Sequence, residues 1–105
     1  MGQVVDKMAY EYWIIVQEKE KIEIAIEKIY TSFKSNELYK NVIKEKDKLV
    51  LPYNDPIWDR WFELEKNNSE IYYWVSSDGI QRDLLIKEIS DVLNKLNLTF
   101  TIEEE

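Results

Sequence analysis

The chain has 105 residues, of which 45% are hydrophobic and 33% are charged, which predicts one folded domain over residues 1–105 and excludes a disordered chain. It has no cysteine and no histidine, which excludes disulfides, thiol nucleophiles, ordinary zinc sites and imidazole chemistry. Its net charge of −7 disfavours direct nucleic-acid binding, because such binding draws most of its affinity from Lys and Arg contacts with phosphates.

The first third of the chain predicts a strand followed by a helix. Residues 8–17 are largely apolar at both alternating positions, which is typical of a central strand. Residues 18–34 alternate briefly as a strand would, but the longer pattern favours a helix with Ile24 facing away from the core. The helical stripe consists of Ile22, Ala25, Ile26, Ile29, Tyr30 and Phe33.

Residues 35–52 are harder to assign. The segment at 35–48 fits a short helical turn, an edge strand or a loop, and all three remain open. Residues 48–51 then predict a short strand that ends at Pro52, which has no amide hydrogen to donate to a strand ladder.

Residues 54–69 predict a short helix near 56–66. Asp55 is a good N-cap, and Pro56 is pre-organised for the first helical position. The stripe that follows has helical spacing and consists of Ile57, Trp58, Trp61 and Phe62. The alternative is that residues 61–65 form a strand in a hairpin with residues 71–75.

The last third of the chain predicts a strand, a helix and a strand. Residues 71–75 are β-branched and aromatic, and residues 76–79 supply turn formers and N-cap side chains. Asn97 ends the helix, and residues 98–102 alternate as a half-buried strand would. The stripe of this helix consists of Leu85, Ile89, Val92, Leu93 and Leu96.

Two strand-then-helix units around a central connection predict an α+β fold. We expect about four mainly antiparallel strands with two long helices on one face, the split βαβ arrangement called ferredoxin-like, plus the short helix at 56–66. No stretch resembles a secretion signal or approaches the roughly 20 apolar residues that span a bilayer, so we expect a cytoplasmic location and no membrane partner.

Few residues are candidates for catalysis or for a cofactor. The densest acids beside aromatic residues lack a partner base, a nucleophile or an oxyanion donor, so we name no catalytic residue. Asp78 and Gly79 lack the other ligands of a calcium loop, so no metal is predicted. Gly2 and Gly79 are the only glycines, which excludes the phosphate-binding glycine motifs and leaves no predicted cofactor. The acids that lie beside aromatic residues are Asp55, Asp59, Glu63 and Glu65.

The chain is rich in aromatic residues, with four Trp and seven Tyr. These residues dominate interfaces as well as cores, because they combine a large apolar area with a polar group. One face of the sheet packs the helices and the other is open, so some of Tyr10, Tyr12, Tyr72 and Trp74 are expected together on the open face, with the short helix as its cover. The candidate interaction residues are Trp58, Asp59, Trp61, Glu63, Tyr72 and Trp74.

These observations predict a small acidic, non-enzymatic protein that binds another protein with a basic surface. In composition the chain resembles immunity proteins, phage or plasmid inhibitors and mimics of nucleic-acid charge, which implies an inhibitory, immunity or regulatory role without assigning any residue. The alternative is a small-molecule-sensing or accessory domain, which needs a concave apolar pocket. An enzyme that uses only carboxylates ranks third. An aromatic open face also suits a two-fold homodimer, with a monomer as the alternative.

Overall fold

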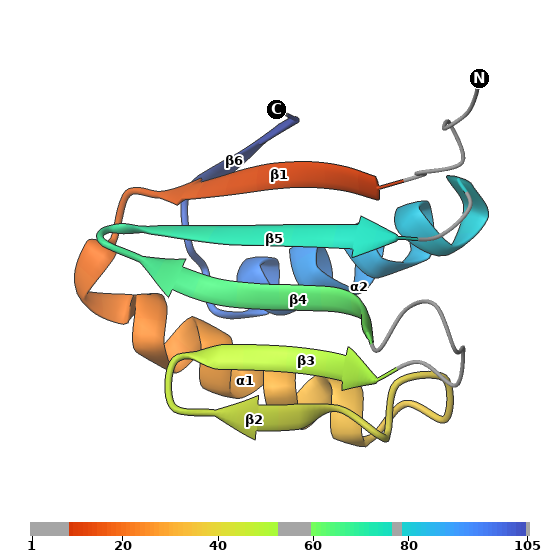
Figure 1. Cartoon of the computed structure of the whole chain (residues 1–105). Coiled ribbons are helices and arrows are strands. Elements are labelled where there is room, and N and C mark those ends of the chain that lie inside the picture. Colours follow the sequence, from red (N-terminus) through yellow and green to blue (C-terminus); the bar gives the residue numbers. More distant parts are fainter. Residues whose placement is uncertain (1–8, 53–59, 77–78, 105) are drawn as a thin grey trace.

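The computed structural model describes residues 9–52, 60–76 and 79–104. Within them, an antiparallel sheet of six strands in the order β2-β3-β4-β5-β1-β6 carries two long helices on one face (Figure 1). The α+β class is therefore confirmed. The elements are β1 (Ala9–Val16), the 3-10 turn η2 (Lys19–Lys21), α1 (Ile22–Lys34), β2 (Ile43–Glu45), β3 (Lys48–Pro52), β4 (Arg60–Asn67), β5 (Glu70–Ser76), α2 (Gly79–Lys95) and β6 (Phe100–Glu104).

The sheet differs from the sequence-based prediction in size and order. It has six strands instead of about four, and its order is not clearly that of a ferredoxin-like fold. One added strand, β2, lies in the segment at 35–48 that sequence patterns left open. It pairs with β3 in a hairpin whose turn places Lys46 at a φ of 41°, in the left-handed region. This short, charged β2 forms one edge of the sheet, which disfavours edge-to-edge aggregation.

The predicted helix at 56–66 is wrong from residue 60 onward, where the chain forms β4. Phe62 and Leu64 are buried whereas Glu63 and Glu65 are half-buried, an alternation that suits a strand. The hairpin alternative is confirmed, because β4 pairs with β5 on one side and with β3 on the other. Ladder bonds on both sides outweigh the local helix signal. The expected helix start at 54–59 lies outside the described residues.

The other predicted elements are confirmed in outline. The first helix begins at Ile22, because residues 19–21 form a 3-10 turn. Ile24 faces away from the core as expected and is 52% exposed. The helix α2 follows the predicted pattern, whereas the strand β6 begins at Phe100, two residues later than predicted, and extends to Glu104. None of the helices in the described part of the chain is long and apolar enough to cross a membrane.

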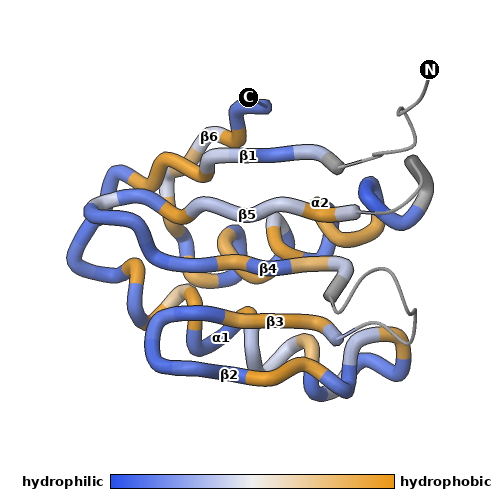
Figure 2. Tube along the Cα trace, in the orientation of Figure 1, coloured by the Kyte–Doolittle hydropathy of each residue, from blue (hydrophilic) through white to orange (hydrophobic). Residues whose placement is uncertain are grey.

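The core lies between the two helices and the sheet. Burying each large apolar side chain contributes about 1.5–3 kcal/mol, so this layer is the main source of stability. Hydrophilic residues gather in the β2–β3 and β4–β5 turns, away from this layer (Figure 2). Fully buried residues include Ile22, Ala25, Ile29 and Phe33 of α1, Leu85, Ile89 and Leu93 of α2, and Ile14, Leu49, Phe62, Leu64, Ile71, Tyr73 and Val75 of the sheet.

The end of α2 is fixed by Asn97, which takes the left-handed conformation with a φ of 58°. The Asn97 amide donates to the carbonyl of Asn94 at 2.9 Å, and the Leu98 amide donates to that of Leu93 at 3.1 Å. This is a Schellman motif, with Leu98 buried against the core as such motifs favour. It turns the chain back into β6.

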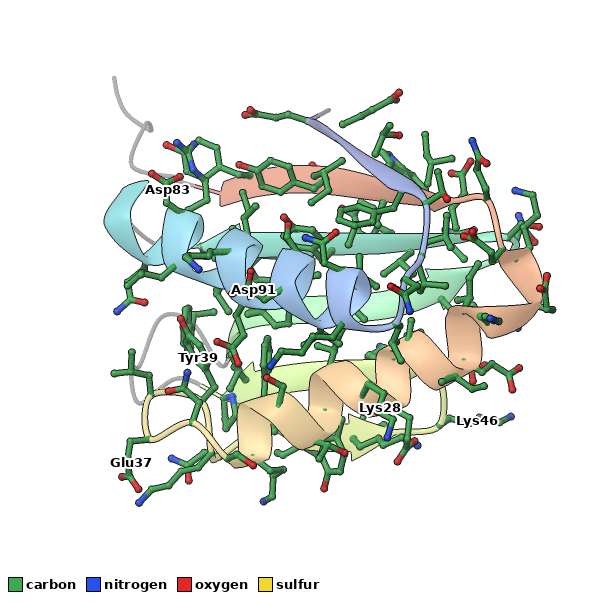
Figure 3. The ribbon with its side chains drawn as sticks, turned by 180° about the vertical axis from the view of Figure 1, so that it is seen from behind. Lys28, Glu37, Tyr39, Lys46, Asp83 and Asp91 are labelled. Carbon is green, nitrogen blue, oxygen red and sulfur yellow. The ribbon has the colours of Figure 1, made fainter. Side chains whose placement is uncertain are left out.

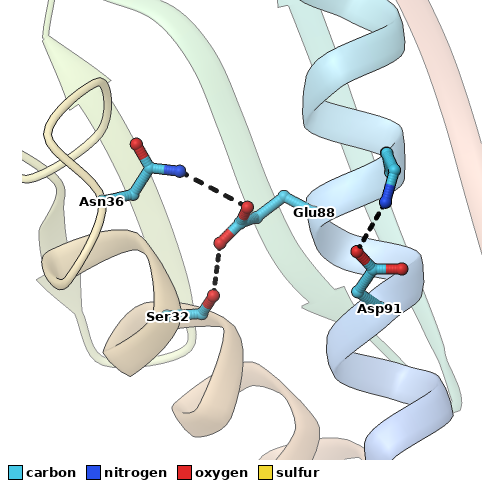
Figure 4. A network of polar contacts seen from close by, with 5 residues as sticks. Ser32, Asn36, Glu88 and Asp91 are labelled. Atoms are coloured by element: carbon cyan, nitrogen blue, oxygen red, sulfur yellow. Dashed lines mark hydrogen bonds and ion pairs between the residues drawn. The ribbon is translucent and has the colours of Figure 1, made fainter.

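A polar link joins the two helices where they run side by side across the covered face (Figures 3 and 4). Glu88 of α2 accepts hydrogen bonds from the Ser32 hydroxyl and, at 3.4 Å, from the Asn36 side-chain amide. Beside it, Lys87 and Asp91 form an ion pair at 3.0 Å along α2. The link sets the position of α2 relative to the end of α1.

Candidate functional site

Alternate residues of the central strands lie on the face of the sheet opposite the helices, which we call the open face. Along β5, Ile71, Tyr73 and Val75 are buried under the helices, while the residues between them are half-buried. Directly opposed residues of antiparallel strands point to the same side, so the strand register assigns the neighbours of Tyr72 and Trp74 to the open face as well.

Three aromatic side chains form the centre of the open face: Trp13, Tyr72 and Trp74. Trp13 lies opposite Tyr72 in the register, with ring centroids 5.0 Å apart and ring planes tilted by 55°. The Tyr72 hydroxyl donates to a carboxylate oxygen of Glu11 at 2.7 Å, and Glu11 lies opposite Trp74. All three rings are half-buried, so each presents part of its surface to solvent.

Carboxylates surround these rings. In the described part of the chain, the register places six glutamates but one lysine, Lys48, on the open face. The Lys48 ammonium lies 2.9 Å from a carboxylate oxygen of Glu63, and this hydrogen bond raises the pKa of the Lys48 amine. Lys48 is therefore already paired with an acid. The glutamates are Glu11, Glu45, Glu63, Glu65, Glu70 and Glu103.

Trp61, a predicted interaction residue, does not join the aromatic group. The register between β3 and β4 shifts at Leu51 and Pro52, where β4 advances by two residues and Trp61 is the extra one. Such a bulge bends a strand and redirects its side chains. The Trp61 ring packs against the buried Tyr39, with ring centroids 6.1 Å apart. Trp61 thus borders the helix-covered core.

Tyr10 and Tyr12, two of the four aromatic residues considered for the open face, lie instead on the covered face. The Tyr12 ring is 4% exposed and stacks on Tyr73 with ring centroids 4.9 Å apart. The Arg82 guanidinium of α2 lies 4.2 Å from the centre of the Tyr10 ring, a cation–π contact. Burial raises the pKa of the phenols of Tyr12 and Tyr73 above their ordinary value.

Of the predicted interaction residues, the structure brings Glu63, Tyr72 and Trp74 together on the open face. Trp58 and Asp59 lie outside the described residues. Trp13 was missed as a candidate. The alternation of residues 8–17 places Trp13 and Tyr12 on different faces of the strand, but the strand alone does not reveal which of its two apolar faces meets the helices.

The open face combines two kinds of side chain. It offers large aromatic surfaces and several carboxylates. Within the described residues, no group of three or more acidic side chains is arranged to hold a metal ion. Comparison of the chain with protein-family models, with curated proteins and with solved structures gives no match in any of the three.

Proposed function

We propose that this protein acts by binding another protein through the open face, and that the partner presents a basic surface. The observation that supports this is the grouping of Trp13, Tyr72 and Trp74 on a face that also carries six glutamates. An inhibitory, immunity or regulatory role, including mimicry of nucleic-acid charge, is compatible with such a surface.

The aromatic centre supplies the affinity in this proposal. Half-buried Trp and Tyr side chains have large contact areas and lose little conformational freedom on binding, so they serve as anchors at interfaces. Tyr72 is held by its hydrogen bond to Glu11 and its contact with Trp13, which reduces the ordering cost of binding.

The glutamates of the open face supply steering and selectivity. Acidic residues around an apolar centre attract a basic partner over long distances and repel an acidic one. Arginine suits this surface especially, because its guanidinium pairs with carboxylates and stacks on aromatic rings.

The same charges argue against a homodimer through this face. Two copies placed face to face oppose six glutamates with six more, whereas each copy contributes one lysine that is already paired with Glu63. The sequence left a homodimer and a monomer open as alternatives, and the open face suits a different partner better than a second copy.

The test is a pull-down at low and at high salt, which compares how much partner protein the wild type and three variants recover. Trp74→Ala is expected to weaken binding by about 2 kcal/mol or more, as truncation of a hot-spot residue does. Lys48→Gln removes a cation from this face, so recovery of a basic partner should increase at low salt.

Leu84→Ala is the matched control, since Leu84 is an exposed apolar residue of α2, 43% exposed. Equal losses in Trp74→Ala and Leu84→Ala, or recovery that does not respond to Lys48→Gln and to salt, would contradict the proposal. Circular dichroism of each variant verifies that it is folded.

For the fold, we propose that β4, β5, β1 and β6 with the two helices form a split βαβ unit, to which the β2–β3 hairpin is added. This is supported by the order β4-β5-β1-β6 within the antiparallel sheet. Cysteines introduced by Ile15→Cys and Thr101→Cys, which are directly opposed, should form a disulfide in this cysteine-free chain. No disulfide under oxidising conditions would contradict the pairing of β1 with β6.

A further inference from the structure

The opposite side of the molecule carries a groove between the two helices, with a volume of about 400 Å³. Lys28, Thr31 and Ser32 of α1 line one wall, and Val92, Lys95 and Leu96 of α2 line the other. Its volume is within the range of roughly 300–1,000 Å³ that small-molecule sites occupy. Both walls belong to helices packed on the covered face, so the groove is separate from the open face (Figure 3).

Two residues of the α2 wall, Val92 and Leu96, give the groove an apolar surface. Val92 is 8% exposed and belongs to the core, and Leu96 packs against that core while remaining half-buried. These two residues belong to the core-facing stripe of α2. An apolar group placed here covers surface that α1 leaves accessible, which is favourable because it removes that surface from water.

The rim carries positive charge in an otherwise acidic protein. Lys28 and Lys95 are exposed and come from different helices, and neither forms an ion pair within the described part of the chain. By contrast, Lys87 on α2 is paired with Asp91 at 3.0 Å. The two groove lysines thus leave two ammonium groups available to one ligand.

The hydroxyl groups of the groove already donate hydrogen bonds within the protein, so they do not compete with the lysines for a ligand. The Thr31 hydroxyl donates to the Glu27 carbonyl at 3.1 Å, and the Ser32 hydroxyl donates to Glu88. Glu88, which lies one helical turn before Val92 on α2, already accepts bonds from Ser32 and Asn36. A ligand therefore finds its hydrogen-bond donors on the lysines.

We propose that this groove binds a small amphiphilic oxyanion, with a carboxylate or phosphate head between Lys28 and Lys95 and a short apolar body over Val92 and Leu96. Lysine is a compact point charge on a flexible stem, so it accepts either head group. The site goes beyond the protein-binding role of the open face and stands independently of it.

The test is a titration of the ¹⁵N-labelled protein, followed by amide chemical shifts, with octanoate and octyl phosphate as the two head groups and octanol as the neutral probe. Saturable shifts confined to the facing sides of α1 and α2 with either anion, and weaker binding of octanol, support the proposal. The absence of saturable shifts with both anions overturns it, and so does equally tight binding of octanol.

The variant Lys28→Gln with Lys95→Gln should weaken anion binding roughly tenfold or more, because two charge-assisted contacts are lost. The matched control is Lys34→Gln with Lys87→Gln, which removes the same charge from the same two helices outside the groove and should change binding less than about twofold. Equal weakening in both double variants would show a general effect of net charge and overturn the site. Trp74→Ala should leave anion binding unchanged, so failure here is distinguishable from failure of the open-face proposal.

Discussion

Tyr73 and Trp74 are neighbours in β5, yet Tyr73 is fully buried beneath the helices and Trp74 lies half-buried among carboxylates. The same contrast separates Tyr12 from Trp13 in β1. The covered face uses its aromatic rings to fill space, stacking them on one another, whereas the open face surrounds its rings with charge. The position of a residue on the pleat, more than its type, determines whether it serves stability or binding.

The largest expected effect is on the covered face. Phe62→Ala should lower the free energy of unfolding by about 3–5 kcal/mol, because a fully buried aromatic ring is lost between Phe33 and Tyr73. Denaturant melts measure this. The control is Glu103→Gln, which changes an exposed acid of the open face and should alter stability by no more than about 0.5 kcal/mol. Comparable losses in the two variants would remove the distinction between the faces.

An intermediate effect is expected at the bulge, where Trp61 lies between the two environments. Its ring is half-buried against Tyr39, so Trp61→Ala should cost about 2 kcal/mol, less than truncation of a fully buried ring. The same denaturant melts give this value. A loss below about 0.5 kcal/mol, typical of exposed sites, would place Trp61 on the interaction surface instead.

Loss of the hydroxyl group should change the free energy of unfolding in opposite directions at the adjacent residues Tyr72 and Tyr73. The buried Tyr73 hydroxyl has no hydrogen-bond partner among the described residues, so Tyr73→Phe should raise the free energy of unfolding by up to about 1 kcal/mol. Tyr72→Phe loses the bond to Glu11 on the open face and should lower it by about 0.5–1 kcal/mol. Thermal and denaturant melts of the pair test this, and a stability loss in Tyr73→Phe would contradict the assignment.

The smallest effect concerns pH at the corner between β1 and η2. The Glu18 carboxylate accepts bonds from the Thr99 amide at 2.9 Å and hydroxyl at 3.0 Å, and the amide bond lowers the pKa of Glu18. Because the folded-state pKa lies below the unfolded one, the stabilisation is present above the unfolded pKa and is lost as pH falls through the folded pKa. Glu18→Gln should be less stable than wild type at neutral pH.

Unfolding measured across a pH series distinguishes this contribution from general acid sensitivity. The difference between Glu18→Gln and the wild type should shrink on acidification, and Glu20→Gln, at an exposed acid of η2, controls for the loss of one negative charge. A difference that persists unchanged at low pH would show that Glu18 acts through packing.

Long periodic segments were the predictable part of this fold. The helix stripes of α1 and α2, the exposure of Ile24 and the end of α2 at Asn97 all follow from local patterns, because each depends on residues within a few turns. The segment from residue 60 to 66 was assigned wrongly because Trp61 and Phe62 continue the helical spacing of Ile57 and Trp58 in the sequence, while Phe62 and Leu64 also fit the alternation of a strand. Three members of the candidate site, Glu63, Tyr72 and Trp74, were named from composition and neighbours alone.

The sequence by itself determined the α+β class, the acidic character and the positions of the long helices, because periodicity and composition are local properties. Only the tertiary structure decided that β4 is a strand, since the gain comes from ladders with β3 and β5 that lie outside the segment itself. It also decided which side of β1 meets the helices. That choice places Tyr12 in the core and Trp13 on the open face, and both sides of the strand were apolar enough to fill either position.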